Sequence, residues 1–262
     1  MLSQAQIEQF HEQGFLNGGA AIGDEEVEVL RAETMRVIEH QGELEHKPVH
    51  IVNLSGKGDA PVWQIVNIWQ ASEPFRHLVS NTKIAEDIAQ LTQASEVRLW
   101  HDQIQYKPAA VGGVNMWHQD SPLWPPLMPK DQQVTAWVAL DDVDEENGCM
   151  WMVPHSHKWG PQMQHIGLMR DFFAMHEEFQ GNITKMVACP VKKGHVHYHH
   201  SLTWHGSGPN TSGRPRRAIA LHYMSDKTVF KKTGAHPMNP FIHVAEGEMM
   251  SGEAFPLVWP RA

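Results

Sequence analysis

Two side chains capable of binding a metal ion stand two positions apart in the segment WHQD, residues 117–120. Positions i and i+2 of an extended segment lie on the same face, so the imidazole of His118 and the carboxylate of Asp120 could bind one ion together. A third ligand could come from His205, the first residue of HGSG at 205–208. Glycine would let the backbone bend there and direct the imidazole.

Two histidines and one carboxylate occupy one triangular face of an octahedron and leave three positions open. This ligand set suits Fe(II) that must bind a cosubstrate and O2 at the same time. Zn(II) accepts the same ligands, usually in tetrahedral geometry with water. The 19 histidines of the chain favour a metal site. The ligand types leave the choice of metal open.

Three arginines follow the third candidate ligand closely, at Arg214, Arg216 and Arg217. They stand at the beginning of a predicted strand, 216–225. A guanidinium can bind a carboxylate through two parallel hydrogen bonds, so one of them could hold the far end of a dicarboxylate cosubstrate. A solvated basic turn is the more common interpretation of a single arginine. The order of the three motifs along the chain favours the binding role.

Composition excludes several classes of protein. The 262 residues carry 21 Lys and Arg against 30 Asp and Glu, a net charge of −9, so we expect no nucleic-acid partner. A hydrophobic content of 41% is enough for a core. No apolar run reaches the roughly 20 residues that span a bilayer, and the first residues do not resemble a signal peptide. We therefore expect a cytoplasmic protein without a membrane partner, with Cys149 and Cys189 reduced.

The first part of the chain is predicted to be helical. Ser3 and Gln6 form a capping box for a helix near 4–13, which Gly14 would end. An apolar stripe predicts a second helix from Asp24 to about residue 40, and Asn81 begins a third. Residues 42–62 are expected to form a loop, and 63–69 fit a strand.

From residue 97 the pattern changes to short segments rich in Val, Ile, Trp and Thr. The predicted strands are 97–107, 132–142, 148–153, 184–191, 195–203 and 216–225. Helices followed by strands predict an α+β fold with an all-β core. We expect one domain over 1–262, with a helical front (1–95), a β core (97–225) and a C-terminal tail (226–262). The connection 155–182 fits either a lid or a surface excursion with a short helix at 168–179.

Taken together, these motifs resemble the phytanoyl-CoA dioxygenase family of Fe(II)/2-oxoglutarate oxygenases. The resemblance is carried by WHQD at 117–120, GCMWMVPHSHK at 148–158, HGSGPN at 205–210, RPRRAI at 214–219 and the N-terminal segment from Phe10 to Phe15. It implies a double-stranded β-helix (jelly roll) core with flanking N-terminal helices. It also implies a dioxygenase that uses Fe(II), O2 and the cosubstrate 2-oxoglutarate.

The resemblance assigns roles to individual residues. The iron ligands would be His118, Asp120 and His205. The residues around 2-oxoglutarate would be Arg216, with Arg214 as the alternative, together with Ser207 and Trp137. Halogenating relatives have Ala or Gly in place of the carboxylate ligand, so Asp120 favours hydroxylation. The predicted reaction is hydroxylation of an unactivated C–H bond of a small molecule, with release of succinate and CO2.

The sequence departs from the family pattern in its extra histidines. The segment 154–157 reads PHSH instead of PGSH, and a strand that usually begins with Gly-Asp begins with Gly194-His195. The histidines on one face of this strand, His195, His197 and His199, are collinear and cannot bind one metal triangularly. We expect them to lie in the core or behind the ligands. The same expectation applies to His101, His155 and His222, although His101 could face the pocket.

Two other classes stay open at this point, a cupin-like metal-dependent isomerase or hydrolase and a non-catalytic metal-binding jelly roll. The non-catalytic jelly roll has no use for Arg216. The hydrolase or isomerase needs a general base near the metal, and Glu145 and Glu146 lie in a turn-like stretch that is typical of solvated loop charge. Acyl-CoA, amino acid, osmolyte, phosphonate and natural-product substrates all remain open. The net charge argues against a basic rim for coenzyme A, unless lysines gather locally, the candidates being Lys107, Lys158, Lys185, Lys192 and Lys193.

We expect a small metabolite as the substrate. The candidate walls of its site are Trp117, Trp124 and the segment 155–182. The tail 226–262 could cover the pocket or join a neighbouring subunit in a homo-oligomer.

Overall fold

Two antiparallel sheets of unequal size form the centre of the computed structural model, which describes residues 1–54, 61–110 and 113–260. The strand order in the larger sheet is β1 (Phe15–Ala20), β12 (His195–His200), β7 (Gln133–Ala139), β14 (Arg216–Ser225), β4 (Val97–Lys107), β3 (Trp63–Val66) and β2 (His50–Asn53), with β16 (Leu257–Trp259) paired to β4. The order in the smaller sheet is β11 (Val187–Cys189), β8 (Met150–Met152), β13 (His205–Ser207) and β5 (Asn115–His118). The predicted jelly-roll core is confirmed.

Strand alternation separates a helix-facing side of the large sheet from a site-facing side. In β14, Ile219, Leu221 and Tyr223 belong to the core cluster that includes the helices, whereas Ala220 and His222 line cavities on the other side. The same alternation in β7 places Val134, Ala136 and Val138 in that core. Successive side chains of a strand point to opposite faces, which explains the division.

In β4 the alternation reverses at one position. Val97 and Leu99 belong to the helix-facing core, yet His101, Gln103 and Gln105 line the cavities. The pairing with β14 shifts register at this point, because His222 pairs with His101 and Tyr223 pairs with Leu99. The extra residue in β4 is a β-bulge, which moves the following odd-numbered side chains to the site-facing side.

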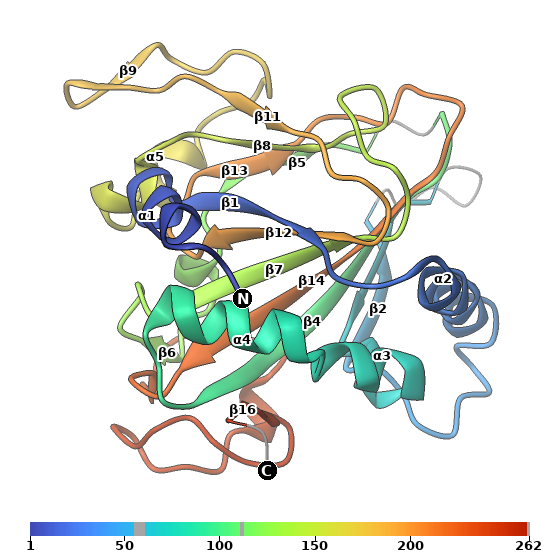
Figure 1. Ribbon diagram of the computed structural model, residues 1–262. Helices are drawn as coiled ribbons and strands as arrows, with labels where there is room; N and C mark the ends of the chain where they lie inside the picture. Colours follow the sequence, from blue (N-terminus) through green and yellow to red (C-terminus); the bar gives the residue numbers. More distant parts are fainter. Residues whose placement is uncertain (55–60, 111–112, 261–262) are drawn as a thin grey trace.

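Four helices cover the outer side of the large sheet (Figure 1), namely α1 (Gln4–Gln13), α2 (Asp24–Glu39), α3 (Glu73–Val79) and α4 (Thr82–Thr92). The capping box is present, with Ser3 Oγ accepting from the Gln6 amide at 3.3 Å, and Gly14 ends α1 at φ 87°. Asn81 Oδ1 accepts from the Ile84 amide at the start of α4. The short helix α3, with Pro at its second position, was not predicted from the sequence.

Other expectations were wrong in part. The predicted loop 42–62 contains β2, and its residues 55–60 lie outside the described residues, as do 261–262 of the tail. The predicted strand 63–69 ends at Val66, because Asn67 adopts a left-handed conformation (φ 58°) and η1 (Ile68–Gln70) follows. The short helix at 168–179, part of one of the two alternatives for the connection 155–182, is absent from these described residues; α5 lies earlier, at Met163–Ile166.

The remaining short elements lie in connections and in the tail. They are η2 (Ser121–Leu123), β6 (Leu127–Met128), η3 (Ser156–Trp159), β9 (Glu178–Phe179), β10 (Asn182–Ile183), β15 (Val229–Phe230) and η4 (Asn239–Phe241). β9 and β10 form a hairpin that projects from the body of the molecule (Figure 1). None of the described helices has the length and hydropathy needed to cross a bilayer.

Candidate metal centre

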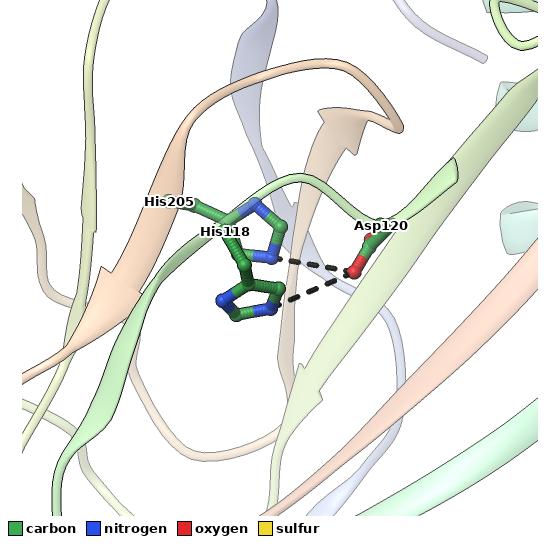
Figure 2. A group of neighbouring side chains, drawn as sticks. All are labelled: His118, Asp120 and His205. Carbon is green, nitrogen blue, oxygen red and sulfur yellow. Dashed lines mark ion pairs between the residues drawn. The ribbon is translucent and has the colours of Figure 1, made fainter. Parts of the chain in front are cut away.

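The three predicted metal ligands lie together between the two sheets. His118 ends β5 and pairs directly with His205, the first residue of β13, and their ring centroids are 4.2 Å apart. Asp120 Oδ1 lies 3.8 Å from His118 Nε2 and 3.4 Å from His205 Nε2 (Figure 2). One donor atom from each side chain lies within 4.8 Å of the others.

The local backbone differs from the extended segment that the sequence predicted. β5 ends at His118, and Asp120 has helical angles (φ −68°, ψ −58°) at the start of η2. The carboxylate therefore approaches the imidazoles from a turn and not from the same strand face. Asp120 remains close enough for all three side chains to contact one ion.

Gly206 lies within β13, not in a turn. A Cβ atom there would stand 2.8 Å from the Asn115 carbonyl oxygen and 2.9 Å from the Phe172 ring. The glycine therefore permits close approach of β5 and of the 160–186 segment, instead of the bend that the sequence suggested. This close approach holds β5 against β13, where His118 and His205 pair.

Both imidazoles are oriented by backbone carbonyls. Nδ1 of His118 lies 2.8 Å from the Met116 oxygen, and Nδ1 of His205 lies 2.9 Å from the Thr203 oxygen. A carbonyl only accepts, so each Nδ1 donates its proton and each Nε2 keeps its lone pair for a ligand on the Asp120 side. Metal-binding histidines are commonly fixed in this way.

The charges suit a divalent cation. Burial lowers the pKa of His118 to about 4 and keeps the ring neutral. Burial alone would raise the pKa of Asp120, but His205 and His199 hold it well below its usual range, so the carboxylate is ionised. Burial would lower the pKa of His205, but the Asp120 carboxylate raises it, so a cation bound at Nε2 would replace a proton there. Two imidazole nitrogens and one carboxylate on one side of an ion form a donor set that fits Fe(II).

The second oxygen of Asp120 is held by other side chains. Thr135 Oγ1 donates to Oδ2 at 2.8 Å, and His199 Nε2 lies 3.1 Å from it. His197, two residues before His199, stacks on Phe15 (centroids 5.8 Å) away from the carboxylate. The positions of His197 and His199 agree with the expectation for this strand, whereas His195 is only partly buried and lines a separate cavity with Lys192.

Two buried cations meet beside this centre, and both donate to one hydroxyl. Nζ of Lys107 lies 2.8 Å from Ser207 Oγ, and Arg216 Nη2 lies 3.1 Å from the same atom. Both side chains are fully buried. Arg216 also donates to the Gly148 oxygen at 3.2 Å, and its guanidinium lies 5.4 Å from the centre of the Trp137 ring.

Within the described chain neither cation has a carboxylate partner. Burial lowers the pKa of Arg216 to about 10 and, together with Arg216, lowers that of Lys107 well below its usual range. Arg214, the alternative anchor, lies at the surface instead, where it pairs with Asp144 at 2.6 Å. Of the two arginines, the structure brings only Arg216 to Ser207.

Lys107 was not recognised as a site residue from the sequence. The sequence offered it only as one of five lysines that could gather into a basic rim, whereas it is fully buried. Strict alternation from Val97 and Leu99 would turn residue 107 toward the outer side of the sheet, and the bulge in β4 reverses that direction. The pairing of Lys107 with Arg216 across β4 and β14 then brings the two cations together.

Two connected cavities adjoin the triad. The inner one, about 40 Å³, is lined by the three ligands with Trp137 and Ser207. The outer one, about 460 Å³, extends from His118 and Asp120 to Trp124, His101 and His236. Trp124 therefore lines a cavity, as expected.

The other two candidate walls of the substrate site, Trp117 and the segment 155–182, do not line the outer cavity among the described residues. The Trp117 ring stacks on Phe172 at 5.1 Å, and its Nε1 donates to the Phe172 oxygen. The outer cavity has no lining residue from 155–182 in the part of the chain that the structure describes. This segment packs over β5 through Trp117 instead of covering the outer cavity.

The comparisons with known proteins agree with this geometry. The family described as phytanoyl-CoA dioxygenase (PhyH) matches residues 10–218. Peroxisomal phytanoyl-CoA dioxygenase of Rattus norvegicus is 28% identical over 250 residues, which cover 86% of this chain and 69% of that protein.

Solved structures give the same result. SnoK, a non-heme α-ketoglutarate-dependent carbocyclase of nogalamycin biosynthesis, matches with a TM-score of 0.79 and 27% identity over 98% of this chain and 96% of that chain. The epimerase SnoN, solved with Fe3+, α-ketoglutarate and nogalamycin RO, shares the fold with a TM-score of 0.72 and 24% identity over 97% of this chain and 98% of that chain.

Proposed function

The chain belongs to the phytanoyl-CoA dioxygenase family, and on that premise we propose that it hydroxylates an unactivated C–H bond of a small molecule, with release of succinate and CO2. Its relatives are 2-oxoglutarate-dependent dioxygenases and related enzymes, so the chain is an oxygenase of that class. The relatedness to these enzymes argues against the two alternatives, a cupin-like isomerase or hydrolase and a non-catalytic jelly roll. We also propose that residues 1–262 act as a single catalytic domain.

One observation carries the proposal for the cosubstrate. Arg216 and Lys107 are buried, converge on Ser207 Oγ and have no acidic partner among the described residues. Burying charges without compensation costs several kcal/mol per ion. A carboxylate placed between the two cations would offset that cost through charge-assisted hydrogen bonds. The distal carboxylate of 2-oxoglutarate meets this requirement.

The metal ligands in this proposal are His118, Asp120 and His205. Bound Fe(II) would supply the oxidation chemistry, because these three ligands leave coordination positions open. The protein positions the reactants: Arg216, Lys107 and Ser207 bind the far carboxylate, and Trp137 forms a wall of the inner cavity.

The test needs no knowledge of the substrate. Metal-free protein is titrated with Fe(II) without O2, then 2-oxoglutarate is added and the visible spectrum is recorded. Chelation of the 2-oxo acid produces a weak charge-transfer band, which we expect in the wild type and not in His118→Ala. Iron binding without this band would overturn the cosubstrate assignment. An undiminished band in His118→Ala would overturn the ligand assignment.

A further inference from the structure

The outer cavity is lined mainly by uncharged polar side chains. Its floor is formed by the site-facing side of β2, β3, β4 and β14, where His101, Gln103, Gln105, Gln64 and His222 lie. Among its described lining residues there is no Lys or Arg, and the only carboxylate is Asp120. Recognition in this cavity therefore depends on the hydrogen-bonding roles of neutral groups.

His101 presents a fixed acceptor. Its Nδ1 lies 3.3 Å from the backbone oxygen of Asp102, which can only accept, so Nδ1 carries the proton. In the neutral ring Nε2 is then an acceptor. The side chain is 3% exposed, and Nε2 has no hydrogen-bond partner in the described chain. A buried acceptor without a partner indicates a ligand that supplies a donor.

His222 presents a second acceptor by an independent chain of contacts. The single proton of Thr135 Oγ1 is donated to Asp120 Oδ2, because a carboxylate only accepts. Thr135 Oγ1 must therefore accept from His222 Nδ1, which lies 2.8 Å away. This fixes the proton of His222 on Nδ1 and leaves the Nε2 lone pair free.

The two acceptors are neighbours beside an aromatic wall. His101 and His222 are paired across β4 and β14, with ring centroids 4.6 Å apart. The Trp124 ring lies 5.7 Å from His101 and 4.8 Å from His222. An apolar wall next to two acceptors suits a ring that carries hydroxyl groups on one edge.

We propose that the outer cavity binds an uncharged, hydroxylated ring compound, whose O–H groups donate to Nε2 of His101 and Nε2 of His222. The proposal rests on the oxygenase function given above and names the substrate class of the same site. It argues against phosphate esters and coenzyme A thioesters, which would require cations that the described lining lacks. A volume of about 460 Å³ admits one small-molecule ring system.

The experiment uses protein loaded with Zn(II), which accepts the same ligands without oxidation chemistry, and saturated with 2-oxoglutarate. Binding of methyl β-D-glucopyranoside, phenyl β-D-glucopyranoside and the charged counterpart glucose 6-phosphate is measured by ligand-observed NMR at tens of millimolar. We expect the neutral glycosides to bind and the phosphate to bind at least about tenfold more weakly. Equal or tighter binding of the phosphate, or no binding of any of the rings, would overturn the proposal.

Variants separate the acceptor role from structural support. His101→Leu should weaken glycoside binding about five- to tenfold, the effect of one lost hydrogen bond. His101→Asn keeps an acceptor and should restore part of the affinity. Equal affinities of His101→Leu and wild type would contradict the acceptor role.

Binding of 2-oxoglutarate, measured first in each protein, separates this proposal from the general function. Loss of 2-oxoglutarate binding in the wild type would count against the oxygenase site itself. Unchanged 2-oxoglutarate binding with no preference for neutral rings would count only against the substrate class.

Discussion

Nε2 of His199 lies 3.1 Å from Oδ2 of Asp120, and the His199 ring lies beside the His205 ring, with centroids 4.4 Å apart. Oδ1 is left to face His118 and His205. The ring that holds one oxygen therefore determines which oxygen is presented to the metal. Such supporting contacts keep a ligand oriented before the ion arrives.

We expect His199→Leu to weaken Fe(II) binding about 10- to 100-fold, because Asp120 loses one of its two orienting partners. The measurement is competition with a chromophoric chelator under anaerobic conditions. His197→Leu is the matched control, since His197 is equally buried on the same strand and stacks on Phe15. Similar losses in both variants would mean that the effect comes from packing and not from Asp120.

Arg216→Ala should weaken 2-oxoglutarate binding by roughly 2–4 kcal/mol, or about 30-fold to several hundredfold, because a buried charge-assisted pair is lost. Arg214→Ala should leave the dissociation constant nearly unchanged, since that side chain is half exposed and pairs with Asp144. Calorimetric titration with 2-oxoglutarate checks both. A larger loss in Arg214→Ala would reverse the assignment of the anchor.

Lys107→Met tests the second cation through the pH dependence of stability. The pKa of Lys107 in the folded protein is below its unfolded value, mainly through burial. Between these two values the unfolded chain binds more protons, so this residue makes the unfolding free energy rise with pH. Raising the pH from about 7 to about 9.5 should therefore stabilise the wild type relative to Lys107→Met when no ligand is bound.

The same variant should lose affinity for 2-oxoglutarate. Denaturant unfolding at the two pH values and one ligand titration give both results. If the unfolding free energies of the two proteins changed with pH in the same way, the pKa of Lys107 would not be lowered by folding.

Gly206→Ala should destabilise the protein by about 1–3 kcal/mol, because the added methyl group would overlap the Asn115 oxygen and the Phe172 ring. Gly213→Ala is the control, since nothing lies within 4 Å of that Cβ position. Its effect should stay within about 0.5 kcal/mol. Equal unfolding midpoints for the two variants would disprove the close packing of β5 and β13.

Much of the fold was predictable because its signals are local. The capping box of Ser3 and Gln6 fixes the start of α1, and Asn81 caps α4 in the same way. Strands β4 and β14 have the predicted limits, 97–107 and 216–225. Such signals depend on neighbours in the chain. The short helix α3 and strand β2 carry weaker signals of this kind and were missed.

The candidate site also has a part that local sequence predicts and a part that depends on tertiary contacts. The sequence by itself determined which residues are candidates for the metal, since His118, Asp120 and His205 are recognisable by type and order. Only the tertiary structure decided what surrounds them, because side chains that meet across strands depend on the register of the sheet. One extra residue in β4 turned Lys107 toward Arg216 and paired His101 with His222. No pattern along the chain records that bulge, since it is fixed by pairing with a strand more than 100 residues away.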